Sequence, residues 1–214
     1  MEVRKTPLIV SALVVAGCSA TAMADLQGIS WTSTASEWGV TYQIYVDVEV
    51  GDQLNAVYGD GDNALSVDST GAFYQNAFGA AVSTGINPAL LPVFPSLAYD
   101  SWVTIGLSDQ VGNAMLNIGI DWANFEAGGS IWTDNGSWFA TPDDAQVYEV
   151  GGQVLIGQFT VASDDGVFGT ISLQGKNADG SNWTAYGEYF NTIPAPGALA
   201  LLGLAGLAAR RRRK

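Results

Sequence analysis

The side chains that most often carry out chemistry in enzymes are scarce in this sequence. It contains no histidine, and its single cysteine, Cys18, lies close to the N-terminus. A Ser-His-Asp or Cys-His nucleophile therefore cannot form in the rest of the chain, and a zinc site there would lack nitrogen and sulfur ligands. Glycoside hydrolysis needs only two carboxylates, so it is the one enzyme class left open. No motif singles out such a pair, and we expect a protein that is not an enzyme.

Acidic turns suggest a second kind of chemistry, the binding of a hard cation. Asp60, Asp62 and Asn63 stand in a GDGDN turn, and Asp164 and Asp165 stand in an SDDG turn. Calcium prefers carboxylate and amide oxygens, which can converge on turns. The alternative is that these turns face water as ordinary loop residues. Calcium is thus a candidate ligand, and no other cofactor is indicated.

Three tryptophans are candidates for binding a glycan. Trp122, Trp132 and Trp138 lie in loop-rich sequence with aspartate and asparagine residues beside them. Sugar-binding modules built on β-sandwiches stack pyranose rings on exposed tryptophans, and nearby polar side chains hydrogen-bond the sugar hydroxyls. The alternative is that each tryptophan belongs to the core.

The charge of the central region excludes several partners. Residues 25–192 carry 20 acidic side chains against one basic side chain, Lys176, a net charge of −19. Nucleic acids and anionic membrane surfaces both require clustered cations, so neither is an expected partner. The chain nevertheless contains seven tryptophans and many other apolar residues, which is too much apolar surface for a disordered segment.

Apolar and polar residues alternate strictly over 40–50, which predicts a β-strand with one buried face that includes Val50. Glycine, aspartate and asparagine turns separate further candidate strands. These are 54–58, 72–75, 102–107, 116–120, 153–161, 167–173 and 182–190. Three prolines within 80–97 predict a loop that crosses over a sheet end. We therefore expect an all-β fold, an antiparallel β-sandwich of jelly-roll-like or immunoglobulin-like form, with a closed barrel as the alternative.

Residues 1–24 have the pattern of a cleavable export signal with a short N-terminal helix. Two cations precede the apolar stretch 7–17, and Ala22 and Ala24 place small residues where a signal peptidase inspects the chain. We therefore expect cleavage after Ala24.

A second processing route involves Cys18. The sequence VAGCS around it resembles the bacterial lipobox, although valine stands where leucine is usual. The resemblance implies lipidation of Cys18, which is the alternative to ordinary cleavage. In either case this cysteine has no partner in the chain for a disulfide bond.

The C-terminal segment combines three features in order. A proline-containing motif (Pro194, Ala195 and Pro196) precedes an uncharged apolar stretch, and five cations follow it. From residue 193 to 209 the chain has 17 uncharged residues, the lower limit for a membrane-spanning helix. The cations, which should remain cytoplasmic, are Arg210, Arg211, Arg212, Arg213 and Lys214.

This segment, 193–214, resembles the PEP-CTERM sorting signal. Both prolines, the apolar helix and the arginine cluster match, whereas Ala195 stands where the family usually has glutamate. The resemblance implies processing by an exosortase-type protease, transient anchoring in the inner membrane and delivery to the surface of bacteria that make extracellular polysaccharide.

The sequence thus predicts a signal peptide (1–24), an acidic β-sandwich domain (25–192) and a sorting segment (193–214). We expect an exported, non-enzymatic cell-surface or extracellular-matrix protein associated with exopolysaccharide. A carbohydrate-binding module is one alternative, and a glycoside hydrolase-like enzyme is the second.

Overall fold

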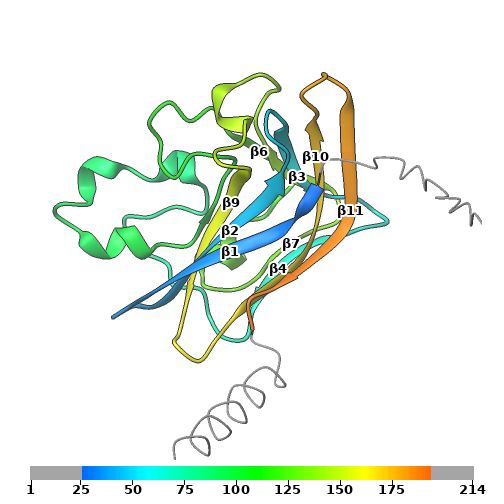
Figure 1. Cartoon of the computed structure of the whole chain (residues 1–214). Coiled ribbons are helices and arrows are strands. Elements are labelled where there is room, and N and C mark those ends of the chain that lie inside the picture. Colours follow the sequence, from blue (N-terminus) through cyan, green and yellow to red (C-terminus); the bar gives the residue numbers. More distant parts are fainter. Residues whose placement is uncertain (1–25, 194–214) are drawn as a thin grey trace, which may run out of the picture.

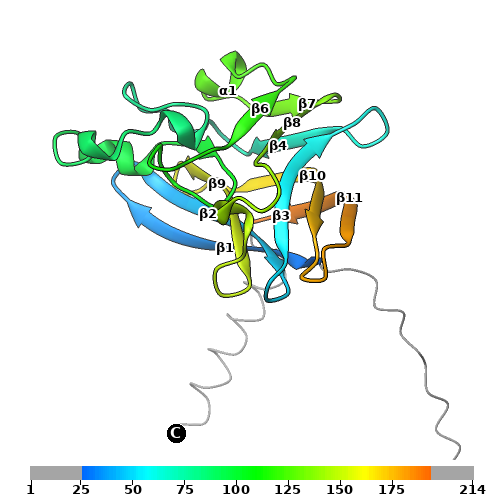
Figure 2. The same cartoon turned by 90° about the horizontal axis from the view of Figure 1, so that it is seen from above.

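A computed structural model describes residues 26–193, which fold into two antiparallel β-sheets packed face to face (Figures 1 and 2). The four-stranded sheet A has the order β1-β2-β9-β5. Its strands are β1 (Leu26–Ser36), β2 (Gly39–Val48), β9 (Gln153–Val161) and β5 (Trp102–Val103). The sandwich class expected from the sequence is therefore confirmed.

Sheet B has seven strands in the order β6-β8-β3-β10-β4-β7, and β11 pairs with β10. Its strands are β3 (Gln53–Gly59), β4 (Leu65–Ser69), β6 (Leu116–Ile118), β7 (Ile131–Thr133), β8 (Gly136–Phe139), β10 (Val167–Lys176) and β11 (Asn182–Asn191). Strand β10 is the centre of the sheet, because β11 runs along one edge while β3 and β4 share the other.

The core lies between the two sheets and follows from the alternation of side chains along each strand. In β2, Ile44, Val46 and Val48 point inward and are buried. They meet inward residues of sheet B such as Leu173 and Trp138 in one continuous cluster. Burial of this cluster is the main stabilising contribution to a domain whose surface charges repel one another.

Most of the predicted strands are present. Strand β9 has the predicted bounds, and β3, β6, β10 and β11 lie within two or three residues of theirs. Strand β2 ends at Val48, because the N–H of Asp52 bonds to the carbonyl of Glu49 and closes a turn. Val50 is consequently 82% exposed, contrary to its predicted place on the buried face.

Other strand predictions were wrong. Residues 72–75 form no strand, since the N–H groups of Phe73 and Tyr74 bond singly to Gly128 and Thr160 rather than to one neighbouring strand. Of 102–107, only the first two residues are in a strand. Four strands were not predicted, namely β1, β4, β7 and β8.

The proline-containing segment 80–97 is a loop, as predicted, with three short 3₁₀ helices. They are η1 (Ser83–Gly85), η2 (Pro88–Leu90) and η3 (Pro95–Tyr99), and prolines open η2 and η3 because the first helical position needs no N–H donor. The loop packs on the outer face of sheet A, through Ile86 and Leu97 against Leu155 and Trp102, rather than crossing a sheet end. In both views it projects on the side away from β11 (Figures 1 and 2).

Asp100 anchors this loop from inside the protein. Its side chain is fully buried, and its two oxygens accept hydrogen bonds from the backbone N–H groups of Asn76 (2.7 Å) and Ala80 (3.0 Å). Burial raises the pKa of Asp100 to about 6, although these N–H donors favour the ionised form.

The remaining elements are short. Helix α1 (Ala123–Glu126) lies between β6 and β7 of sheet B, and the 3₁₀ helix η4 (Ala145–Val147) lies between β8 of sheet B and β9 of sheet A. Within residues 26–193, no helix is long and apolar enough to span a membrane. The predicted signal peptide with Cys18, the predicted cleavage site and the sorting segment from Pro194 onward lie outside the described residues.

Candidate functional site: the aromatic face of sheet B

The three tryptophans proposed for glycan binding have different environments. Trp138 is 1% exposed, and its indole N–H donates to the carbonyl of Thr104 (3.0 Å), so the prediction for Trp138 was wrong. Trp122 is half-buried, and its indole N–H donates to Asn117 Oδ1 (3.0 Å). Trp132 is 59% exposed. Only Trp132 therefore offers a free ring face at the surface.

Trp132 lies at one end of a row of side chains on the outer face of sheet B. Its backbone pairs with Ser66, Ser66 pairs with Thr170, and Thr170 pairs with Tyr189. Directly paired residues share a face of the sheet, and the neighbouring Ile131 points into the core. Since adjacent strands are about 4.8 Å apart, the row spans about 14 Å from Trp132 to Tyr189. Two half-buried hydroxyls thus lie between two exposed aromatic rings.

A second pair of rings lies beside this row. Tyr58 pairs with Ser172, the next outward residue of β10 after Thr170, and its ring meets Tyr186 edge-on at 6.5 Å. Ser172 is buried beneath them and accepts a hydrogen bond from the N–H of Gly187 (3.2 Å). Gly187 adopts φ +64°, a left-handed conformation that glycine tolerates without strain. The irregular pairing of β10 with β11 here keeps both Tyr186 and Tyr189 exposed.

We call this surface the aromatic face and define it by six residues. They are Tyr58, Ser66, Trp132, Thr170, Tyr186 and Tyr189. None of the six carries a charge at neutral pH. Burial, and then the neighbouring Tyr186, raises the pKa of Tyr58 to about 12, so its phenol stays neutral in alkaline solution. The six residues are themselves neutral in a domain of net charge −19, and Asp68, the next outward residue of β4 after Ser66, places one carboxylate beside them.

The acidic turns do not combine into one cation site. Asp60 Oδ1 accepts the backbone N–H groups of Asp62 (3.0 Å) and Asn63 (2.8 Å), and these bonds, chiefly the one from Asn63, lower its pKa. Asp165 Oδ1 instead accepts the Thr70 hydroxyl (2.7 Å). The first turn precedes β4 and Thr70 follows it, so the two turns lie at opposite ends of that strand.

Asp164 is exposed in the second turn. The described residues contain no group of three or more histidine, cysteine, aspartate or glutamate side chains placed to hold a metal ion. Asp60 acts in the structure as a cap of the turn between β3 and β4.

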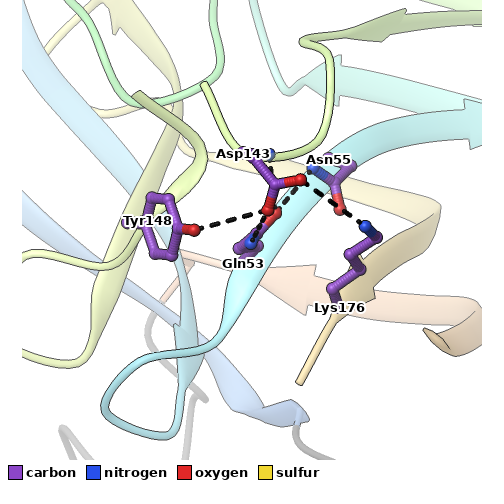
Figure 3. A network of polar contacts seen from close by, with 5 residues as sticks. All are labelled: Gln53, Asn55, Asp143, Tyr148 and Lys176. Atoms are coloured by element: carbon purple, nitrogen blue, oxygen red, sulfur yellow. Dashed lines mark hydrogen bonds and ion pairs between the residues drawn. The ribbon is translucent and has the colours of Figure 1, made fainter. Parts of the chain in front are cut away.

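Lys176, the single basic residue of the described chain, belongs to a polar network (Figure 3). Its Nζ lies 3.8 Å from Asp143 Oδ2, while Asp143 Oδ1 accepts bonds from Gln53 Nε2 (3.0 Å) and the Tyr148 hydroxyl (3.4 Å). The bond from Gln53 and then the charge of Lys176 lower the pKa of Asp143. A carboxylate held ionised in this way is a poor proton donor. The network therefore has a structural role, which is to hold the β8–η4 loop against β3 and β10.

The chain matches none of the protein-family models, curated proteins or solved structures with which it was compared. Sequence analysis predicted only part of the aromatic face. It selected Trp132 as a candidate glycan-binding residue but neither Tyr186 nor Tyr189. The tyrosines lie on one face only because the pairing of β11 with β10 shifts near Gly187, a feature without a sequence signal of its own.

Proposed function

We propose that this chain is an exported, non-enzymatic cell-surface or matrix protein whose β-sandwich binds neutral polysaccharide through the aromatic face. The observation that carries the proposal is the exposure of three rings, Trp132, Tyr186 and Tyr189, by 58–62% on one face of sheet B. Large apolar rings gathered at a surface indicate a ligand that covers them.

The chemistry of the face selects the class of ligand. The flat C–H faces of a sugar ring pack on Trp132 and Tyr189, and the sugar hydroxyls exchange hydrogen bonds with Ser66 and Thr170 between them. A polyanion would approach against a net charge of −19, so the field of the protein favours a neutral polymer over an acidic one. The row from Trp132 to Tyr189 suits a short run of sugar units.

Delivery to the surface rests on the two ends of the chain. The signal-like segment 1–24 and the PEP-CTERM-like segment 193–214 support export by a signal peptidase and an exosortase-type protease. In this proposal the acidic domain 25–192 is the part that reaches the polysaccharide.

The finer class that we propose for the sandwich is jelly-roll-like. Strands from the first part of the chain pair with strands from the last part, as β2 does with β9 and β3 with β10. This nested pairing of distant strands favours a jelly-roll-like over an immunoglobulin-like connection.

Affinity electrophoresis of the purified domain in gels containing soluble neutral β-glucan tests the proposal. Trp132→Ala and Tyr189→Ala should each weaken binding roughly tenfold, from the ~1–1.5 kcal/mol of one ring contact. Trp31→Ala, which removes a 41%-exposed tryptophan from β1 in sheet A, is the matched control and should bind normally. Equal retardation of all four proteins, or cleavage of the glucan by the pure domain, would refute the proposal.

A further inference from the structure

A groove runs along the outer face of sheet A, on the side of the sandwich away from the aromatic face. Two cavities of about 170 and 190 Å³ lie there, and they share Gln43, Ala98 and Gln158 among the residues that line them. The two cavities lie next to each other between the sheet and the 80–99 loop, with the Gln158–Ala98 hydrogen bond where they meet, and together we call them the groove. Together they fall at the lower end of the roughly 300–1,000 Å³ found for small-molecule sites.

The floor of the groove is polar, uncharged and held in place by its own hydrogen bonds. Gln43 Nε2 donates to Gln158 Oε1 (3.2 Å), and the Tyr45 hydroxyl donates to Gln43 Oε1 (3.0 Å). Gln158 Nε2 in turn donates to the carbonyls of Ala98 (3.0 Å) and Asp100 (2.9 Å), which fixes the loop to the floor. The amide groups are therefore oriented before any ligand arrives, which lowers the entropic cost of binding.

Hydroxyls and an aromatic wall complete the groove. Thr32 and Thr34 are exposed on the outward face of β1 and line the same cavity as Thr41. On the opposite side stands Tyr99, whose ring stacks on Trp38 with centroids 4.8 Å apart. Hydroxyls, oriented amides and a braced ring form a set that hydrogen-bonds and stacks a sugar.

The charge in the groove points to the same class of ligand. No residue lining the first cavity is ionisable at neutral pH, and the second has one carboxylate, Asp109. An acidic sugar polymer would find no cation here to pair with its carboxylates or sulfates, whereas a neutral polymer needs no such ion pair.

We infer that this groove is a second binding site for a neutral glycan chain, and that the domain cross-links polysaccharide by holding one chain on each side of the sandwich. This inference rests on the proposed function, because it assumes that the aromatic face binds the same class of polymer. The outer faces of two packed sheets point in opposite directions, so one chain in the groove does not block another on the aromatic face. Two such sites on a rigid body join separate chains into a network.

The test uses the domain with short neutral β-gluco-oligosaccharides and with the corresponding long glucan. Calorimetry with the oligosaccharide should give two sites per domain, and the long glucan should gain viscosity when the domain is added. Thr34→Arg places a long side chain in the groove and should reduce the stoichiometry to one and abolish the gain in viscosity. Ser33→Arg, at the adjacent exposed position on the other side of β1, is the matched control and should behave like the wild type.

The variants distinguish failure of this inference from failure of the proposed function. If Thr34→Arg keeps two sites and full cross-linking, the groove is not a glycan site, while loss of one site in Trp132→Ala would still support the aromatic face. If the wild type binds one oligosaccharide and only Trp132→Ala abolishes it, the groove is likewise excluded. If the wild type binds no neutral glucan at all, both the inference and the proposed function are wrong. Melting curves of each variant verify that it is folded.

Discussion

Acidification from pH 7 to pH 4 should stabilise the folded domain through Asp100. Its side chain is fully buried, and burial raises its pKa from 3.8 to about 6. The folded state therefore binds this proton more tightly than the unfolded state does. The resulting stability is fully present below pH 3.8 and is lost as the pH rises through 6. A difference of about two pKa units, at 1.36 kcal/mol per unit, corresponds to about 3 kcal/mol.

The Asp100→Asn variant isolates this contribution from the general relief of carboxylate repulsion at low pH. Asparagine does not titrate, so the free energy of unfolding of the variant should gain about 2 kcal/mol less than that of the wild type between pH 7 and pH 4, because the full contribution of about 3 kcal/mol is reached only below pH 3.8. At pH 7 the variant should be less stable by about 1–3 kcal/mol, because an amide cannot accept from both Asn76 and Ala80.

Urea unfolding followed by tryptophan fluorescence, at constant ionic strength and several pH values, measures both effects. Asp134→Asn removes an exposed carboxylate and is the control that should keep the pH dependence of the wild type. If Asp100→Asn and the wild type gain the same stability on acidification, Asp100 has an ordinary pKa and the reasoning from its burial is refuted.

Three further outcomes are expected. Trp138→Ala should cost about 3–5 kcal/mol of unfolding free energy because it opens a cavity in the core. Trp132→Ala removes an exposed ring and should cost less than about 1 kcal/mol. Equal losses in urea unfolding would contradict the placement of Trp138 in the core and Trp132 at the surface. Calcium should raise the melting temperature no more than magnesium at the same concentration, since the acidic turns do not converge; a shift specific to calcium would restore the cation-site hypothesis. The intact mass of the protein from its native cells should begin at Asp25 and end near Pro196; a lipidated Cys18 as first residue, or a retained terminal arginine cluster, would contradict this processing.

Local patterns were enough to predict the fold class. Alternation along β2 is carried by the residues of that strand alone, because a strand with one buried face needs an apolar residue at every second position. Strand β1 was missed because its inward positions include Ser33 and Ala35 near an open sheet edge, where burial is slight. The charge of −19 likewise follows from composition and needs no structure.

The candidate sites were decided by tertiary pairing. Trp132 and Trp138 are six positions apart in similar surroundings, yet Trp138 pairs with the inward Val57 and Trp132 pairs with the outward Ser66. Tyr189 reaches the same face from the far end of the chain because β10 lies between β4 and β11. A sequence specifies which side chains share a face within one strand, but the partners of that strand determine which face meets water and which rings become neighbours.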